Sequence, residues 1–185
     1  MNSSVFFFIA VSICSSKVAA QGADQPKQVD KASLPVPNEK QQLFYLQRDP
    51  NANTVVYTLN IKDNGQLDEE EPVAAYWILY EENGKRKDLS FIQRKLAYGI
   101  EYKKLNKGEY EIHLASYKKL PMRLAYCPQS KQYEAFASIN HRQTIVEKIF
   151  VRIAGGSLFK PHIDYIELTG RDPQSGERVN HLLPL

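Results

Sequence analysis

The stretch "TVVYTLNI", residues Thr54 to Ile61, decides the fold class. Its residues alternate with a period of two, which is typical of a β-strand that has one buried face. The buried face is formed by Val55, Tyr57, Leu59 and Ile61. We therefore expect a strand here, with Thr54, Val56, Thr58 and Asn60 on the other face.

Further strands are predicted along most of the chain. "AAYWILYE" (74–81) is apolar on both faces, which suits a strand covered on both sides. "EYEIHLASY" (109–117) alternates again, and "PMRLAYC" and "QYEAFASI" flank a four-residue turn as a hairpin would. We predict an all-β domain of about eight antiparallel strands, built as a sandwich or a barrel. The sequence does not choose between them, although aromatic residues on both faces slightly favour two packed layers.

One short α-helix is predicted near residues 89–98. Ser90 and Gln93 have the spacing of a capping box, in which each side chain binds the other residue's backbone N–H. Leu89, Ile92 and Leu96 would form one apolar face, and Gly99 stands where a C-terminal cap of positive φ is expected.

The N-terminal end predicts export. "VFFFIAVSIC" (5–14) has the length of a signal-peptide core, and the small residues at 18–20 suit cleavage after Ala20. An uncleaved anchor, a buried strand and a lipid anchor on Cys14 are the alternatives, and Ile13 disfavours the last of these. Residues 21–41 are polar and carry three prolines, so we expect a flexible linker before one globular domain at 42–185. The final compartment would be the periplasm or the extracellular space.

Charge and cysteine content narrow the function classes. Loss of residues 1–20 removes Lys17 and no acidic residue, so the net charge falls from +3 to +2. That charge implies no strong overall field for nucleic acid or for an anionic membrane, so no nucleic-acid partner is predicted. No later segment predicts a transmembrane span. Cys127 alone remains, so the mature chain has no internal disulfide. Without a base or an electropositive setting nearby, Cys127 is expected to be buried and inert.

The first candidate site is "KPHIDYIELTG" (160–170). In a strand, His162 and Asp164 point to one face about 7 Å apart, and Ile166 and Leu168 would continue that face. They could hold a metal or act as an acid–base pair with His141 or His181. The alternative is a solvated strand edge. No metal and no cofactor can be named from the sequence.

Two further candidates are weaker. Residues 60–71 resemble a calcium loop, but Asn60 and Lys62 replace expected acidic ligands, so a hairpin turn followed by an acidic loop is the alternative. Arg94 and Tyr98 could bind a small ligand at the open end of the strands. Polar helix faces are more often only solvated.

Four segments, "NTVVYTLN", "AAYWILYE", "SFIQRKLAYGI" and "HIDYIELTGRD", resemble an exported, mostly bacterial domain family of unknown function. "IQRKLAYG" is the most distinctive of these pieces. The likeness extends over roughly Leu43 to Leu183. It implies one exported domain and supplies no activity and no catalytic residues.

Three functions fit these observations. The first is a non-catalytic binding or interaction domain for a small ligand or an envelope protein. Its cleft would lie near the helix, with Arg94 and Tyr98 at the rim beside His162 and Asp164. The second is an envelope hydrolase or metal-dependent enzyme that uses His162 and Asp164 with His141 or His181. The third is a structural envelope protein that holds a partner at an exposed, apolar strand edge.

Overall fold

The computed structural model describes residues 34–49, 51–157 and 160–185. The predicted signal peptide and most of the predicted linker lie outside these ranges. The described secondary structure is mostly β, as predicted, with a short helical segment at residues 91–98. The first four strands are β1 (Gln42–Arg48), β2 (Thr54–Leu59), β3 (Val73–Leu79) and β4 (Lys85–Asp88). A short 3-10 turn, η2 (Tyr80–Glu82), joins the last two of them, and the helical segment after β4 consists of α1 (Phe91–Gln93) and η3 (Arg94–Tyr98). The remaining strands are β5 (Ile100–Asn106), β6 (Glu109–Leu114), β7 (Tyr117–Cys127), β8 (Gln132–Ile139), β9 (Arg142–Ser157), β10 (Lys160–Arg171) and β11 (Arg178–Leu183).

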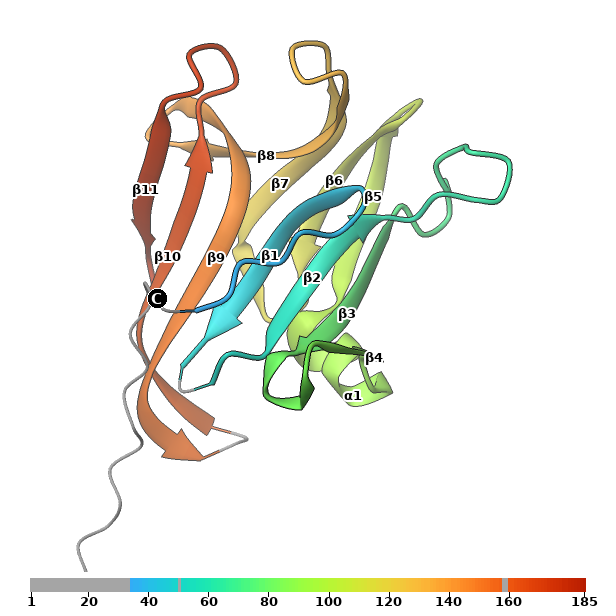
Figure 1. Ribbon diagram of the computed structural model, residues 1–185. Coiled ribbons are helices and arrows are strands. Elements are labelled where there is room, and N and C mark those ends of the chain that lie inside the picture. Colours follow the sequence, from blue (N-terminus) through green and yellow to red (C-terminus); the bar gives the residue numbers. More distant parts are fainter. Residues whose placement is uncertain (1–33, 50, 158–159) are drawn as a thin grey trace, which may run out of the picture.

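The long strand β9 organises the sheet. Ile145 pairs with Phe136 of β8 and with Arg171 of β10, and Ile149 pairs with Leu46 of β1 and with Leu168 of β10. Strands β8 and β1 therefore share one edge of β9, and β10 occupies the other. From that shared edge the sheet divides into two halves, β1 to β4 and β8 to β5, which curl around a common interior (Figure 1).

The all-β prediction is confirmed with three refinements. The described residues form eleven strands instead of about eight, and these strands make one curled sheet. The pairing of β1 with β9 is parallel, whereas the other ladders are antiparallel. In the described part of the chain β4 and β5, which end the two halves, pair only with β3 and β6, so the sheet does not close there.

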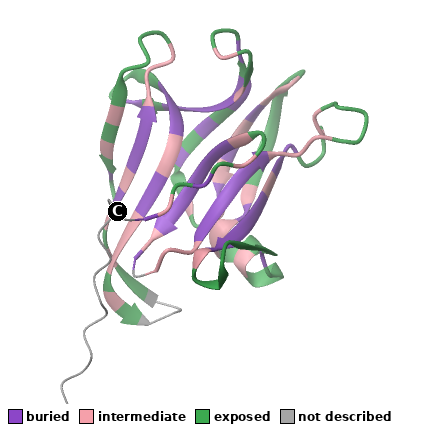
Figure 2. Cartoon of the chain, in the orientation of Figure 1, coloured by how far each residue is buried: buried purple, intermediate pink, exposed green. Residues whose placement is uncertain are grey.

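The core lies between the two halves of the sheet. Val55 and Tyr57 of β2 are fully buried, as the alternation in "TVVYTLNI" predicts, and Tyr110 and Ile112 of β6 face them from the other half. Tyr57 stacks on Phe44 with ring centroids 4.4 Å apart. Figure 2 shows this burial along the central strands.

A second apolar cluster covers the outer face of β1 to β3. It consists of Tyr45, Val56, Tyr76 and Ile78. The segment 34–41 crosses this face: Leu34 is buried, the Gln47 side chain donates to the Pro35 carbonyl (2.6 Å), and Tyr76 donates to Glu39 (3.1 Å). The last eight residues of the predicted linker therefore pack against the domain.

The helix forms as predicted, but its environment differs. Both bonds of the capping box are present between Ser90 and Gln93. The C-cap Gly99 has φ −68°, so the prediction of a positive φ is wrong. Glycine is needed there because a Cβ would lie 2.0 Å from the carbonyl oxygen of Arg94.

The predicted apolar face of the helix is also wrong. Leu89 is buried, but Ile92 and Leu96 are 66% and 65% exposed. The reason is the π-helical turn at Arg94–Tyr98, which brings residues five apart onto one side. Gln93 and Tyr98, which are five apart, both contact Trp77, so these two side chains replace the apolar ones against the sheet.

Candidate functional site

His162 and Asp164 lie on β10, and both are exposed. The register of β10 on β9 shifts between Ile163, which pairs with Ile153, and Tyr165, which pairs with Arg152. Asp164 is therefore the extra residue of a β-bulge, and the alternation of faces changes phase at this point.

The bulge overturns one predicted detail of this strand. Ile163, Ile166 and Leu168 all pack on the core, so Ile166 and Leu168 share the face of Ile163 and not that of Asp164. Beyond the bulge Tyr165 points to the outside, where its ring lies 6.2 Å from that of Phe150. His162 and Asp164 thus lie on a solvated part of the strand.

The structure does not bring the histidines together. His141 directly precedes β9, whereas His162 pairs with Gly155 near the far end of that strand. About 45 Å of extended strand lies between His141 and Gly155. His181 pairs with Leu168, six residues beyond His162. Among the described residues, no three His, Cys, Asp or Glu side chains are grouped closely enough to hold one metal ion.

Arg94 and Tyr98 face different environments. The Arg94 guanidinium lies 3.5 Å from the Glu71 carboxylate at the surface. Tyr98 packs edge-on against Trp77, with centroids 5.0 Å apart, and burial raises the pKa of its phenol. The Arg48 guanidinium lies 5.7 Å from the Tyr98 ring and 5.8 Å from the Trp77 ring. Tyr98 is therefore part of the packing beneath the helix.

The calcium-like segment adopts the predicted hairpin alternative. Ile61 bridges to Leu67, and Gly65 takes a φ of +79° in the turn. Lys62, at a position where a calcium loop needs a ligand oxygen, lies 3.3 Å from Asp68. Backbone N–H groups that bind the Asp68 carboxylate lower its pKa, with the N–H of Glu70 as the largest cause.

Cys127 is buried, as predicted, at the end of β7. Burial raises the pKa of its thiol, but hydrogen bonds from Ser130 and Gln129 outweigh this effect and leave the pKa below its ordinary value. Its Sγ also lies 3.3 Å from the Gln129 side chain. A buried thiol held by its own turn has a packing role.

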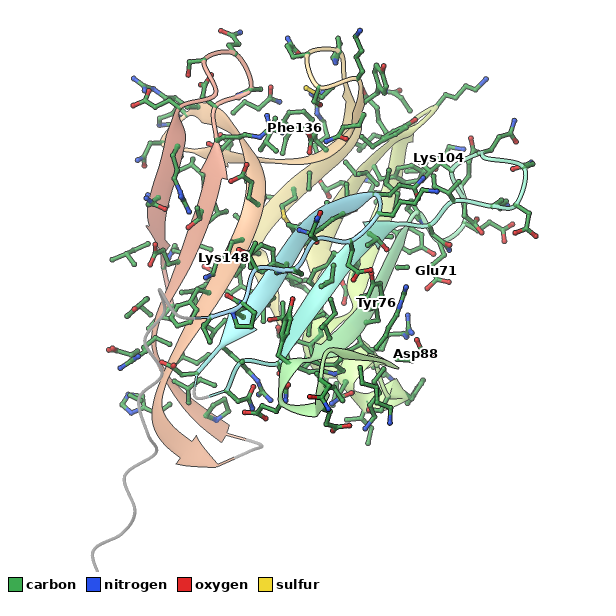
Figure 3. All side chains as sticks on the ribbon, viewed as in Figure 1. Glu71, Tyr76, Asp88, Lys104, Phe136 and Lys148 are labelled. Carbon is green, nitrogen blue, oxygen red and sulfur yellow. The ribbon has the colours of Figure 1, made fainter. Side chains whose placement is uncertain are left out.

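The outer face of the β5 to β9 half carries a continuous row of cross-strand neighbours. Glu111 of β6 pairs with Arg123 of β7, Arg123 pairs with Phe136 of β8, and Phe136 pairs with Ile145 of β9. Directly paired residues have their Cβ atoms about 5 Å apart on the same face. The row thus places one anion, one cation and one aromatic ring side by side. Figure 3 labels Phe136 on this part of β8.

A hollow of about 480 Å³ lies over this row. We call it the outer hollow. It is lined by Leu105, Glu111, Pro121, Met122, Arg123, Phe136, Ala137, Ser138, His141 and Gln143. Its volume is within the range of small-molecule sites, which are mostly apolar with a few convergent polar groups.

Arg123 is the central cation of the outer hollow. Its guanidinium carbon lies 5.7 Å from the Phe136 ring centroid, and its side chain is 46% exposed. Its ion pair with Glu109 is long, at 4.0 Å. Glu111 accepts a 3.3 Å contact from His113 and also lines the hollow. Both charges are therefore accessible to a ligand.

One candidate residue from the sequence, His141, lines the outer hollow. It lies in the tight turn between β8 and β9, where Asn140 and His141 both take positive φ. The turn therefore places His141 in the lining of the hollow with Glu111, Arg123 and Phe136.

In a comparison with protein-family models, residues 44–181 match a domain of unknown function (DUF4833). The chain belongs to the DUF4833 family. The predicted membership of a family of unknown function, over roughly Leu43 to Leu183, is confirmed. No curated protein and no solved structure matches the chain.

The outer hollow of this DUF4833 domain was missed in the sequence. Arg123 and Glu111 each stand at an outward position of an alternating strand, which is where solvated charges also stand. The hairpin pattern in "PMRLAYC" and "QYEAFASI" was the one sequence feature that could have indicated the hollow. The pattern does not give the register of the two strands, and it is the register that places Arg123 opposite Phe136.

The DUF4833 domain has no helix in its described residues with the length and hydropathy of a membrane span.

Proposed function

We propose that this DUF4833 chain is an exported, non-catalytic binding domain whose ligand occupies the outer hollow. The observation that carries the proposal is the accessible Arg123 guanidinium between Glu111 and Phe136. Export is supported by the apolar run at residues 5–14 and the small residues at 18–20.

The chemistry of the hollow favours a small zwitterion with an apolar portion, as an amino acid has. An anion bound to Arg123 would be repelled by the neighbouring carboxylate of Glu111. A cation bound to Glu111 would be repelled by the neighbouring guanidinium of Arg123. A molecule with both charges satisfies both side chains. The exposed Leu105 and Pro121 give the apolar part a surface to pack against, and the buried Phe136 lies beneath them.

The polar groups at the other end would fix orientation. Ser138, His141 and Gln143 line the hollow on the side of β8 and β9. Each can donate or accept a hydrogen bond. They suit the remaining polar atoms of such a ligand.

Four probes test this assignment by isothermal titration calorimetry. Phenylalanine carries both charges and a ring, 3-phenylpropionate lacks the ammonium, phenethylamine lacks the carboxylate, and glycine lacks the ring. Phenylalanine should bind most tightly, with a dissociation constant on the order of 1 mM from about 0.3 kcal/mol per non-hydrogen atom. Equal affinity for all four probes, or no affinity for any, would overturn the zwitterion assignment.

Variants then locate the site. Arg123→Ala and Glu111→Gln should each weaken phenylalanine binding by about tenfold, the lower end for a charge-assisted contact. Arg94→Ala is the matched control, because Arg94 is equally exposed and pairs with Glu71 away from the hollow. If Arg94→Ala weakens phenylalanine binding as much as Arg123→Ala does, the ligand does not bind in the outer hollow.

The export part has its own test. Mass measurement of the chain recovered from outside the cytoplasm should give a mature protein that starts at Gln21. A chain that retains Met1 and stays in the cytoplasm would contradict export and leave the hollow assignment unaffected.

A further inference from the structure

Three large apolar side chains project from the helical segment. Phe91, Ile92 and Leu96 are 75%, 66% and 65% exposed. We call these three residues the apolar tip. In Figure 2 the helix and β4 form an exposed corner of the molecule.

The apolar tip is held in this orientation from beneath. Trp77 donates to the Gln93 side chain (3.4 Å), and Tyr57 donates to the backbone carbonyl of Tyr98 (2.9 Å). Leu89, just before the helix, is buried in the core. The outward direction of the tip is therefore fixed by the packing of the opposite side of the helix.

Basic residues lie on the same side of the sheet as the tip. Lys85 and Lys87 of β4 pair with Leu79 and Trp77, whose side chains face the core, so both lysines lie on the helix side of the sheet. Lys95 lies within the helix, with its Nζ 5.8 Å from the Phe91 ring. The neighbouring Asp88 pairs with Tyr76 and so lies on the opposite face.

We propose that the apolar tip docks on the surface of a lipid bilayer that contains anionic lipid. Apolar side chains at one corner can enter the boundary between headgroups and acyl chains, while the surrounding lysines contact anionic headgroups. A second copy of the chain is a poorer occupant, because two tips would bring their lysines together. This surface docking is separate from ligand binding in the outer hollow.

The test is co-sedimentation of the mature chain, residues 21–185, with vesicles. Phosphatidylcholine vesicles are compared with vesicles that also contain phosphatidylglycerol. Binding should need phosphatidylglycerol and should weaken about tenfold or more in high salt, because surface charge attraction is screened. No binding to either kind of vesicle would overturn the proposal.

The variants separate the tip from general surface hydrophobicity. Phe91→Ser, Ile92→Ser and Leu96→Ser combined should weaken vesicle binding about tenfold or more. The matched control combines Tyr102→Ser, Tyr126→Ser and Leu182→Ser, which also replace exposed apolar residues. Circular dichroism should show both triple variants folded, since all six positions are exposed. Equal vesicle binding by the two variants would contradict docking through the tip.

Further variants test the role of the lysines and the alternative of a second copy. Lys85→Glu with Lys87→Glu should abolish the preference for phosphatidylglycerol, and retention of that preference would overturn the role of the lysines. Light scattering could instead show that the wild type is a dimer and the tip variant a monomer, with no binding of either to vesicles. That result would overturn the proposal and assign the tip to contact with a second copy. Arg123→Ala should leave vesicle binding unchanged, so failure here and failure of the hollow are distinguishable.

Discussion

The guanidinium of Arg171 on β10 reaches across β9 to Glu134 on β8, with 2.8 Å between Nη2 and the carboxylate. Glu134 is only 3% exposed, and Arg171 also binds Glu147 through Nε at 3.0 Å. Arg171, Glu134 and Glu147 together join three strands at the point where β8 leaves β9. A buried carboxylate of this kind is costly to leave without its cation.

Arg171→Met should therefore lower the free energy of unfolding by about 3 kcal/mol, because it leaves Glu134 buried without its charge partner. Urea denaturation followed by tryptophan fluorescence measures this loss. Glu147→Gln is the matched control, since its carboxylate is 43% exposed and should cost less than about 1 kcal/mol. Equal losses in the two variants would contradict the assignment of Glu134 as the buried member.

Stability should fall in alkali because of buried phenols. Burial, with a smaller contribution from Tyr98, raises the pKa of Tyr57 far above its ordinary value, and burial raises the pKa of Tyr76 to about 12. Both phenols keep their protons in the folded state after the unfolded chain has lost them. Their stabilising effect is complete below about pH 10 and is lost as the pH rises above that value, by about 1.4 kcal/mol per pH unit for each phenol.

Tyr57→Phe isolates one of these phenols. It removes the 2.9 Å bond to the Tyr98 carbonyl, which should cost about 1 kcal/mol at neutral pH. Above about pH 10, it should also make the free energy of unfolding fall less steeply with pH, by about 1.4 kcal/mol per pH unit. Urea denaturation at a series of pH values measures both effects. An unchanged slope would show that Tyr57 already ionises in the folded protein.

Gly99→Ala should damage the end of the helix. The added Cβ would lie 2.0 Å from the Arg94 carbonyl oxygen, so the backbone must move. We expect a loss of about 2–4 kcal/mol in thermal or urea unfolding. Gly84→Asn is the comparison, because Gly84 has a φ of +76° in open space and asparagine tolerates that region. A neutral Gly99→Ala variant would contradict the close approach.

The domain should need its residues 34–41. A chain that begins at Gln42 loses the buried Leu34 and the hydrogen bond from Gln47 to Pro35. It should be at least about 2 kcal/mol less stable than a chain that begins at Leu34. Comparison of their urea midpoints measures this difference. Equal midpoints would show that residues 34–41 do not contribute to stability.

The sequence predicted the strand content well because alternation is a local signal. In "TVVYTLNI" and "EYEIHLASY" the period of two selects residues that pack on the core, except Ile61, which lies beyond the end of β2. The capping box at Ser90 was equally local. The bulge at Asp164 and the π-helical turn at Arg94–Tyr98 were not predicted, because each is imposed by packing against distant residues. Both changed which side chains face outward.

The candidate sites show the same limit. His162 and His141 have the chemistry of a site, but only the register of β9 and β10 reveals how far apart they lie. Arg123 lacked any local motif, and its neighbours Glu111 and Phe136 come from two other strands. A site that consists of a row across a sheet becomes visible only when the pairing is known.

An NMR titration of the ¹⁵N-labelled chain of residues 21–185 with phenylalanine tests directly whether the outer hollow binds a ligand. Binding there should produce chemical-shift changes that saturate together and centre on Glu111, Arg123, Phe136 and Gln143, and these changes should disappear in Arg123→Ala. Shifts centred elsewhere, or the same shifts in Arg123→Ala, would contradict the proposal that the outer hollow is the binding site.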